Sequence, residues 1–552
     1  MAIPSLALIP TGFKDGKLYS VLPESGVGDF TAVRGSGATR VNSAGLIEDV
    51  RILSGELVTN GDFSNGSTDW QEKSGVIVSV DSSGLVFDNS IGNVAAGVFQ
   101  NIGLSDGKNY RMTATMQLLT GASNGNFSLQ TSTAAGSGQS LVYSGETLVV
   151  GGDAVTETFE FTPALGDVSV QLSCNQANAT FKISNISVKE VTDATNIPRL
   201  DYTDGGCPSL LLEPQSTNLV TYSEDFSNAS WTKVNTTIAS NDAISPDGAQ
   251  NADKLIITST EGVHETMETL ATVSGNYTFS IFAKQGEYKN ILLWDDGLSG
   301  GVGVNLNDLS VFRDQNNQGY EIVDFGNGWV RISLNHTYVS QAPIIGIYVY
   351  DNSATPLITY AGDNVSGLHI YGAQFEALSY STSYIPTSGV IATRLADSVS
   401  GAGDATTFNS TEGVLYFEGS ALSNENVQRI LSISDGTNSN AIQLGFLNSA
   451  TDYRVFGSVR VGGVSQAFLS YNFGAVAPTF KKCAIRYKQN DFSLWIDGVE
   501  LVTGTSGNTP IGLNELTFTR GDAGQGLYGK VKDLRTYNTA LTDAELLILT
   551  TI

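Results

Sequence analysis

Short runs in which apolar and polar residues alternate dominate this chain. The alternation is strict in residues 158–162, 168–173 and 330–335. A period of two places one face of a strand on a core and the other toward solvent. Such runs recur along the chain with no helical period between them, so the pattern predicts an all-β protein built of antiparallel sandwiches.

One of these strands is expected to be irregular. In residues 181–188 the apolar phase slips by one position between Ile183 and Ile186. A slip inside an otherwise regular strand is typical of a β-bulge, which we expect near Ser184 and Asn185.

The C-terminal region carries the signals of a hairpin and of a helix start. Asp497-Gly498 lies between two apolar runs, and this pair supplies the positive φ angles of a type I′ turn. Thr542 and Glu545 form a capping box, in which each side chain bonds the other residue's backbone N–H. We therefore expect a hairpin at 497–498 and one short helix after Thr542. The leucines expected to pack it are Leu546, Leu547 and Leu549.

One motif occurs twice. An Asp-Phe-Ser-Asn sequence begins at Asp62 and again at Asp225, and a tryptophan follows each copy, at Trp70 and Trp231. The separation is about one domain, which indicates a duplicated module. The offset between matching positions grows along the copies, so the second copy contains extra residues, which we expect in surface loops. Because the two tryptophans recur at matching positions, we expect both to be structural.

Composition and charge restrict the partners. A chain of 552 residues should hold several domains. Charged residues make up only 15%, below the roughly 25% of ordinary soluble domains, and the net charge is −26 with no run of lysine or arginine. Such a surface repels phosphate backbones and anionic lipids, so nucleic acid and membranes are not expected as partners.

Cysteine, histidine and apolar segments exclude further classes. Cys174, Cys207 and Cys483 lie far apart and offer no small disulfide framework, and the three histidines have no zinc-ligand spacing. The apolar start lacks the cationic region and long apolar core of a secretory signal, and no stretch approaches the ~20 apolar residues of a membrane span. We expect a soluble chain whose cysteines stay reduced unless lysis of the cell releases it.

Turn-rich connectors divide the chain into parts. The predicted parts are a segment of residues 1–55, a first module of 56–192, a connector of 193–215, a second module of 216–390 and a C-terminal unit of 391–552.

Several phrases resemble known sandwich families. Residues 483–487, 494–499 and 531–542 resemble the closing half of laminin-G or concanavalin A-like sandwiches. The repeated modules resemble carbohydrate-binding-module jelly rolls, whose first strand often carries an Asn-Gly-Asp-Phe opening such as residues 60–63. The resemblance implies two antiparallel jelly-roll sandwiches followed by a concanavalin A-like sandwich and a short C-terminal helix.

The connecting phrases are similar to those of structural proteins of tailed bacteriophages. These phrases are residues 28–31, 38–42, 45–48, 208–219 and 384–389. In such proteins the phrase at 45–48 commonly runs within a few residues into one like 198–202, whereas here the whole first module separates them. We therefore expect the first jelly roll to be an insertion, with residues 193–215 packing against residues 28–55.

This second resemblance implies a structural protein of the virion. The expected protein is a head fibre, tail fibre or other appendage that displays sandwiches for adhesion to host-surface glycan. Residues 1–55 would attach it to other virion proteins, a homotrimer is expected by analogy with fibres, and the chain would be made in the host cytoplasm without a signal peptide. The alternatives are a secreted bacterial glycan-binding adhesin and a glycan-cleaving enzyme.

Catalysis is not expected from the sequence. Glycanases on a concanavalin A-like scaffold place paired carboxylates at alternate positions of one strand, and residues 394–552 contain no such string. A nucleophile elbow, a phosphate loop and a metal-binding helix are absent too. Only carboxylates brought together by the fold would escape this search.

Aromatic residues give the candidate glycan site. Sugar rings stack on aromatic faces, with amides and carboxylates around the rim. Tyr348 and Tyr350 share a strand face opposite Ile347 and Val349, and Trp294 ends another strand that could join them. The same stripe is also typical of a core or a subunit interface, and that interpretation stays open.

Asp62 and Asp225 are candidate ligands of a structural Ca²⁺. Jelly rolls of this type often bind one such ion near the first strand through carboxylate and backbone oxygens. No dense Asp-x-Asp loop supports the two residues, and no other cofactor is expected. A fall in the melting temperature on addition of EDTA would test this hypothesis.

Overall fold

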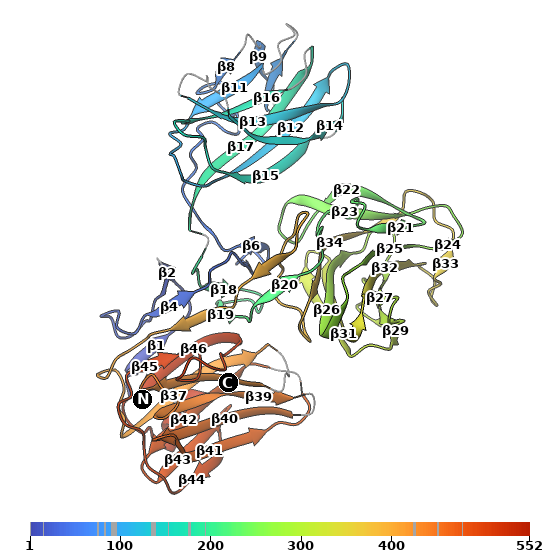
Figure 1. Cartoon of the computed structure of the whole chain (residues 1–552). Helices are drawn as coiled ribbons and strands as arrows, with labels where there is room; N and C mark the ends of the chain where they lie inside the picture. Colours follow the sequence, from blue (N-terminus) through green and yellow to red (C-terminus); the bar gives the residue numbers. More distant parts are fainter. Residues whose placement is uncertain are drawn as a thin grey trace. The chain divides into compact units, whose positions relative to one another are not determined.

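The protein is almost entirely antiparallel β-structure (Figure 1). The computed structural model describes residues 2–14, 16–73, 77–81, 84–89, 96–133, 140–152, 154–174, 178–193, 195–422, 427–449, 452–476 and 479–551. Within these ranges there is one short helix, α1 (Asp543–Thr550), and it lies at the C-terminus. The predicted fold class, all-β and multi-domain with a short C-terminal helix, is confirmed. The chain divides into two compact units, residues 51–194 and residues 1–50 with 195–552.

Two further findings concern membrane-spanning helices and cysteines. In the described part of the chain, no helix has the length and apolar character needed to cross a membrane. Cys207 and Cys483 carry free thiols, the first exposed and the second buried.

Residues 51–194 form one sandwich of two antiparallel sheets. One sheet has the order β15-β12-β17-β10-β9, with β7 beside β17, and the other has the order β14-β13-β16-β11-β8. Alternate residues of β12, such as Met112 and Ala114, are fully buried in the core between the sheets. The strands are β7 (Ile52–Leu53), β8 (Gln71–Lys73), β9 (Ile77–Asp81), β10 (Gly84–Asp88), β11 (Ala96–Asn101), β12 (Tyr110–Thr120), β13 (Gly125–Ser132), β14 (Ser140–Leu148), β15 (Val155–Phe161), β16 (Ser169–Cys174) and β17 (Thr180–Asp193).

The two ends of this sandwich lie side by side. Strand β7 pairs with the end of β17, with Ile52 opposite Asp193 and Leu53 opposite Val191. A sandwich with adjacent ends can interrupt another fold without separating its parts, which suits an inserted module.

The expected bulge in β17 is confirmed. Thr115 of β12 pairs with Asn185, but its neighbour Met116 pairs with Ile183, so Ser184 has no partner across the ladder. The extra residue restores the inward direction of the apolar side chains after the phase slip.

Residues 216–390 form a second sandwich with the same strand order. Its sheets are β21-β25-β32-β27-β28-β29 and β22-β23-β34-β26-β31-β30. The strands are β21 (Thr232–Val234), β22 (Thr236–Ile244), β23 (Gln250–Ile257), β24 (Gly262–Val263), β25 (Glu265–Thr269), β26 (Val273–Lys284), β27 (Asn290–Asp295), β28 (Gly300–Asn305), β29 (Val311–Gln315), β30 (Gly319–Gly326), β31 (Trp329–Gln341), β32 (Ile344–Tyr350), β33 (Thr359–Tyr360) and β34 (Gly367–Glu376).

Strands β29 and β30 have no counterpart in the first sandwich. They follow β28 in the chain, and each extends one sheet at its edge. They account for extra residues in the middle of the second copy. The expectation that such residues form surface loops was wrong for this segment, because both strands find an open sheet edge with which to pair.

The repeated tryptophan has the same role in both sandwiches. Trp70 packs on Phe63 with ring centroids 5.7 Å apart, and Trp231 packs on Phe226 at 4.9 Å. Each indole N–H donates to a backbone carbonyl just before its own motif, that of Asn60 or Tyr222. Both rings are buried, so the predicted structural role is confirmed.

The third sandwich combines distant parts of the chain. One sheet has the order β18-β19-β46-β37-β42-β43-β44 with β1 beside β46, and the other has the order β41-β40-β39-β38-β45. The strands are β1 (Leu6–Leu8), β18 (Arg199–Asp201), β19 (Ser209–Leu212), β37 (Glu412–Ala421), β38 (Val427–Ser434), β39 (Ala441–Ser449), β40 (Asp452–Val461), β41 (Val464–Asn472), β42 (Lys481–Lys488), β43 (Asp491–Ile496), β44 (Val499–Gly504), β45 (Glu515–Thr517) and β46 (Gly529–Tyr537).

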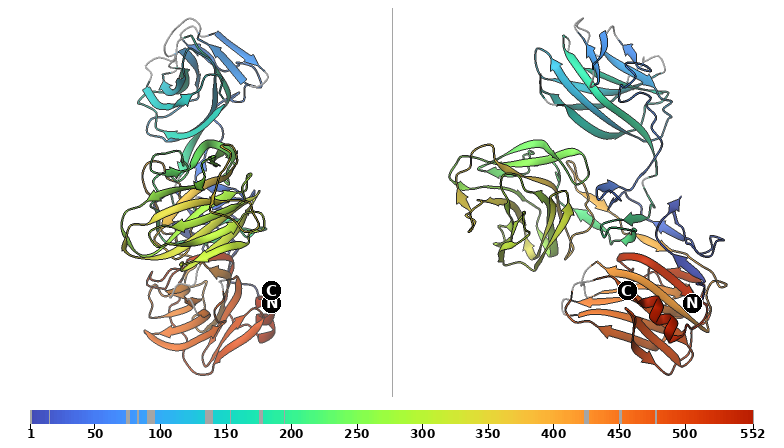
Figure 2. Two further views of the ribbon diagram at one scale, coloured as in Figure 1. Left: turned by 90° about the vertical axis from the view of Figure 1, so that its right-hand side faces the viewer. Right: turned by 180° about the vertical axis from the view of Figure 1, so that it is seen from behind.

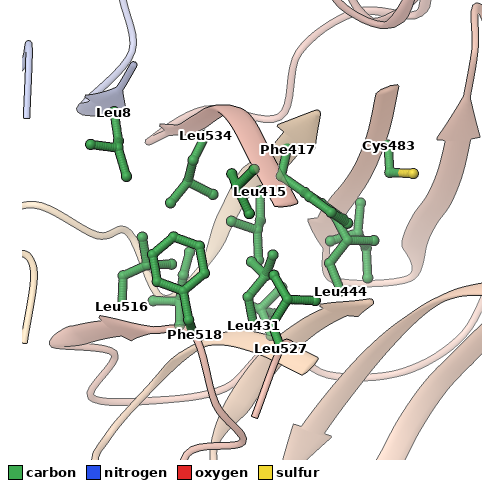
Figure 3. Packing of buried hydrophobic residues seen from close by; sticks show 14 of the residues in the cluster. Leu8, Leu415, Phe417, Leu431, Leu444, Cys483, Leu516, Phe518, Leu527 and Leu534 are labelled. Atoms are coloured by element: carbon green, nitrogen blue, oxygen red, sulfur yellow. The ribbon is translucent and has the colours of Figure 1, made fainter. Parts of the chain in front are cut away.

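The N-terminal strand differs from the predicted boundaries. Leu6 and Leu8 are fully buried in the core of the third sandwich, and Leu8 lies opposite Leu534 (Figure 3). Both ends of the chain lie at this sandwich, where the backbone N–H of Ala2 donates to Glu545 (Figure 2). The start of the predicted segment 1–55 is therefore part of the C-terminal sandwich.

The C-terminal hairpin and helix form as predicted. Asp497 and Gly498 both have positive φ, and Ile496 pairs with Val499 across them. Thr542 and Glu545 form the reciprocal capping box of α1. Leu546 and Leu549 of the helix pack over the outer face of the sheet, whereas Leu547 is 47% exposed and differs from the prediction.

Short connecting strands join the second and third sandwiches into one compact unit. Arg199 of β18 bonds Glu213 at 2.5 Å and also pairs with Asp397. Arg34 pairs with Asp397 as well, and Arg394 pairs with Glu213. Burial raises the pKa of Glu213, but the charges of Arg199 and Arg394 hold it well below its usual range. The connecting strands are β2 (Phe13–Lys14), β3 (Lys17–Leu18), β4 (Phe30–Val33), β5 (Thr39–Val41), β6 (Ile47–Asp49), β20 (Ser216–Asn218), β35 (Ala392–Arg394) and β36 (Ser398–Ser400).

Candidate functional site

The sheet β21-β25-β32-β27-β28-β29 of the second sandwich brings the predicted aromatic residues together. Alternate residues of β27 and β32 point into the core, while the residues between them form a separate cluster on the outer face. We call Trp294, Tyr348, Tyr350 and Phe312 of this outer cluster the aromatic platform. The strand period of two produces this separation, as the sequence predicted.

Glycine makes room for the indole of Trp294. Its cross-strand neighbours are Gly301 on β28 and Gly346 on β32. A Cβ at Gly301 would lie 2.8 Å from Trp294 Cε3, and one at Gly346 would lie 2.7 Å from Tyr348 Cε2. Because these positions carry no side chain, the rings approach the backbone of the sheet closely.

Arg313 of the edge strand β29 covers part of the platform. Its guanidinium carbon lies 4.3 Å from the centroid of the Trp294 ring, within the range of a cation–π contact. The same guanidinium donates to Tyr350 Oη at 2.7 Å and to Gln315 Oε1 at 3.1 Å. Phe312 packs on Tyr350, with ring centroids 5.2 Å apart.

Two carboxylates border the platform. The hydroxyl of Tyr348 donates to Asp296, with both carboxylate oxygens at 2.8 Å. Glu265 lies directly across the strand ladder from Tyr348. Burial raises the pKa of Glu265, and the charge of Asp296 raises it further.

The platform is closely packed as it stands. Trp294, Tyr348 and Tyr350 are 9%, 6% and 5% exposed. A ligand could therefore contact the face of Trp294 only if the Arg313 side chain moved aside. Arg313 is held on an edge strand by one aromatic ring and two neutral acceptors, with no carboxylate within ion-pair distance among the described residues. These contacts are weaker than a buried ion pair, so such a movement is physically accessible.

The first sandwich carries polar side chains on the corresponding face. Gln130 of β13 and Gln171 of β16 lie opposite each other and are hydrogen bonded, and Lys73 donates to Gln171. Serines 128 and 173 flank them and are buried. An amide network therefore occupies this part of the face in the first sandwich, with Phe99 of β11 opposite Gln171.

The two predicted calcium ligands hold turns. Asp62 accepts from the backbone N–H and hydroxyl of Ser64, and Asp225 accepts from Ser227 and Asn228. The hydrogen bonds from Ser64 lower the pKa of Asp62. Across the described ranges, no three or more His, Cys, Asp and Glu side chains group in a way that could hold a metal ion. Calcium binding at these residues stays a prediction.

Four residues of the site were not predicted from the sequence. Phe312 and Arg313 come from the extra edge strand β29, and its pairing partner could not be read from the chain. Asp296 lies just beyond the end of β27 and meets Tyr348 only across the sheet. Glu265 is opposite Tyr348 only through the β25–β32 register, which has no local signal.

Comparison with known proteins gave structural neighbours alone. The chain matches no known family model and no curated protein. The CBM22-1 xylan-binding domain of Paenibacillus barcinonensis Xyn10C is 15% identical over 25% of this chain and 96% of its own, with a TM-score of 0.22. The tandem CBM22-1–CBM22-2 domain of that protein is 12% identical over 58% and 98%, with a TM-score of 0.21.

A family 16 carbohydrate-binding module is similar as well. It is 19% identical over 24% of this chain and 98% of its own, with a TM-score of 0.19. These neighbours are carbohydrate-binding modules, but all three TM-scores lie below 0.5. The conclusions below therefore depend on the side chains of this chain.

Proposed function

We propose that this chain is a non-enzymatic adhesion protein whose second sandwich binds neutral glycan at the aromatic platform. The observation that carries the proposal is the set of rings laid over glycine-bearing strands, with Asp296 and Glu265 at their border. Aromatic faces stack on the C–H faces of sugars, and carboxylates accept from sugar hydroxyls. In the bound state the sugar takes the place of Arg313 over Trp294.

An array of neutral glycans tests this function on the full chain. Oligosaccharides derived from xylan, cellulose and chitin would be immobilised, and the tightest binder measured by calorimetry. Asp296→Ala removes a hydroxyl acceptor and should weaken binding by about 1–2 kcal/mol, or about 5- to 30-fold. Asp308 lies on an exposed loop between β28 and β29, so Asp308→Ala is the matched control and should leave the affinity for the oligosaccharide unchanged. No binding on the array would reject the proposal.

One observation favours a second candidate, a glycan-cleaving site. Two carboxylates flank Tyr348, and the raised pKa of Glu265 suits a general acid. We favour binding without cleavage because the Tyr348 hydroxyl is hydrogen bonded to both carboxylates and so lies between them, where the scissile bond would have to be. Release of reducing ends from the bound oligosaccharide, and its loss in Glu265→Gln, would establish the enzyme instead.

The setting we propose is a tailed-phage virion. The support is the resemblance of residues 28–31, 38–42, 45–48, 208–219 and 384–389 to phrases of virion appendage proteins. On this proposal the chain is part of a homotrimeric fibre or other appendage, bound to other virion proteins through surfaces of the N-terminal region. Mass spectrometry and cryo-electron microscopy of purified parent particles test it. Absence of the chain from the particles would favour the secreted adhesin.

A further inference from the structure

A cavity lies on the opposite side of the second sandwich from the aromatic platform. It has a volume of about 220 Å³ and lies over the outer face of β26, β30 and β31, and Thr39 and Arg40 of β5 line it as well. Phe282 and Phe325 form an edge-to-face pair in its wall, with ring centroids 5.0 Å apart. Arg331 lines the same cavity, and its guanidinium lies 5.1 Å from the Phe282 ring.

Arg331 differs from the other cations around this cavity. Arg40 is paired with Glu48, and Lys530 is paired with Asp201 and Asp204. Among the residues that the structure describes, Arg331 donates to two neutral groups, the carbonyl of Thr382 at 2.7 Å and the hydroxyl of Ser280 at 3.0 Å.

Within the described residues, no carboxylate lies within ion-pair distance of Arg331. A guanidinium has five N–H donors, so donors remain after these two bonds.

The nearest buried carboxylates are already occupied. Glu213 is bonded by Arg199 and Arg394, and Glu376 accepts from Ser216, Gln374 and Thr382. Burial lowers the pKa of Arg331, which indicates that its charge is incompletely compensated. A partly desolvated cation of this kind is stabilised by an anion that brings its own hydrogen-bond acceptors.

The geometry points to this cavity as a binding site for a single carboxylated sugar ring, held by Arg331 through the carboxylate and by Phe325 and Phe282 along the ring face. The volume suits one ring, being smaller than the pockets of drug-sized ligands. The net charge of −26 opposes a polyanion, so a ligand with one carboxylate fits better than a highly charged polymer. This site is independent of neutral-glycan binding at the platform.

Calorimetry of the full chain with sodium glucuronate tests the site, with glucose and acetate as comparison ligands. We expect glucuronate to bind at least about tenfold more tightly than either, because one lacks the carboxylate and the other lacks the ring. Arg331→Gln should abolish this preference. Equal binding of glucuronate and glucose, equal binding of glucuronate and acetate, or no binding of glucuronate would overturn the proposal.

A second variant, at an exposed residue, tests the proposal if Arg331→Gln fails to fold. Glu321 lines the cavity from β30, and Glu321→Gln removes a like charge near the ligand carboxylate. Glucuronate should then bind about two- to fivefold more tightly, while Asp324→Asn on the same strand, away from the cavity, changes nothing. Unchanged or weaker binding in Glu321→Gln would contradict the proposal.

The two sites are separated by one further variant. Arg313→Ala alters the platform and should leave glucuronate binding unchanged. If Arg313→Ala changed glucuronate binding while Arg331→Gln did not, the acid would bind at the platform and the cavity proposal would fail. If the full chain bound glucuronate but no neutral glycan, the platform proposal would fail and the cavity proposal would stand.

Discussion

Replacing Arg313 with alanine should tighten the binding of neutral glycan to the aromatic platform. In the free protein the guanidinium lies 4.3 Å from the Trp294 ring centroid and donates to Tyr350 at 2.7 Å. A sugar that stacks on Trp294 must break both contacts. An exposed cation–π contact is worth about 0.5–1 kcal/mol and a hydrogen bond about 0.5–1.5 kcal/mol. The variant removes this competition, so affinity should rise by about 1–2 kcal/mol, or about 5- to 30-fold.

Calorimetry with the tightest neutral oligosaccharide from the array measures this change. Arg429→Ala is the matched control, because Arg429 makes a similar contact with Tyr528 at 4.9 Å in the third sandwich. The control should bind with unchanged affinity. Weaker or equal binding by Arg313→Ala would refute the view that Arg313 shields the platform, since it would show that the arginine is a ligand contact or irrelevant.

Three further changes test the fold and its pH dependence. Residues 52–193 can be replaced by a short Gly-Ser linker, because β7 and β17 bring the ends of the insertion together. The melting temperature of the remaining unit, measured by calorimetry, should stay within about 2 °C of its value in the full chain. An insoluble product would contradict this. Leu8→Ala should lower the free energy of unfolding of the third sandwich by about 2–5 kcal/mol, measured with denaturant. Ile9 is 37% exposed, so Ile9→Ala should lower it far less. Equal effects of the two substitutions would show that β1 is not part of the core.

The third change is at Glu268, whose pKa burial raises to about 7. The folded protein then holds this proton more tightly than the unfolded chain, so stability is lost as the pH rises from about 4.5 to 7. Glu268→Gln should raise the melting temperature at pH 8 and leave it unchanged at pH 4; an equal shift at both values would contradict the assignment.

Local signals in the sequence predicted local structure well. The hairpin at Asp497-Gly498, the capping box at Thr542 and the bulge at Ser184 depend on residues close together in the chain. Each has a steric or hydrogen-bonding cause that operates within a few residues. The duplicated Trp motif also predicted a repeated structural contact, because the same short segment folds onto itself in both copies.

Features that depend on long-range pairing could not be read from the sequence. Strand β1 pairs with β46 across almost the whole chain, and three apolar residues at the start give no indication of that partner. Strand β29 was hidden because an insertion can form either a loop or an edge strand, and the choice depends on an open sheet edge. The aromatic stripe was visible, but Arg313 and Glu265 join it only through cross-strand register.

A crystal structure of the full chain with the tightest neutral oligosaccharide tests the central claim most directly. The account predicts a sugar ring stacked on Trp294, with the Arg313 guanidinium displaced from that face and a sugar hydroxyl bonded to Asp296. A bound sugar elsewhere on the protein, with Arg313 still over Trp294, would contradict it.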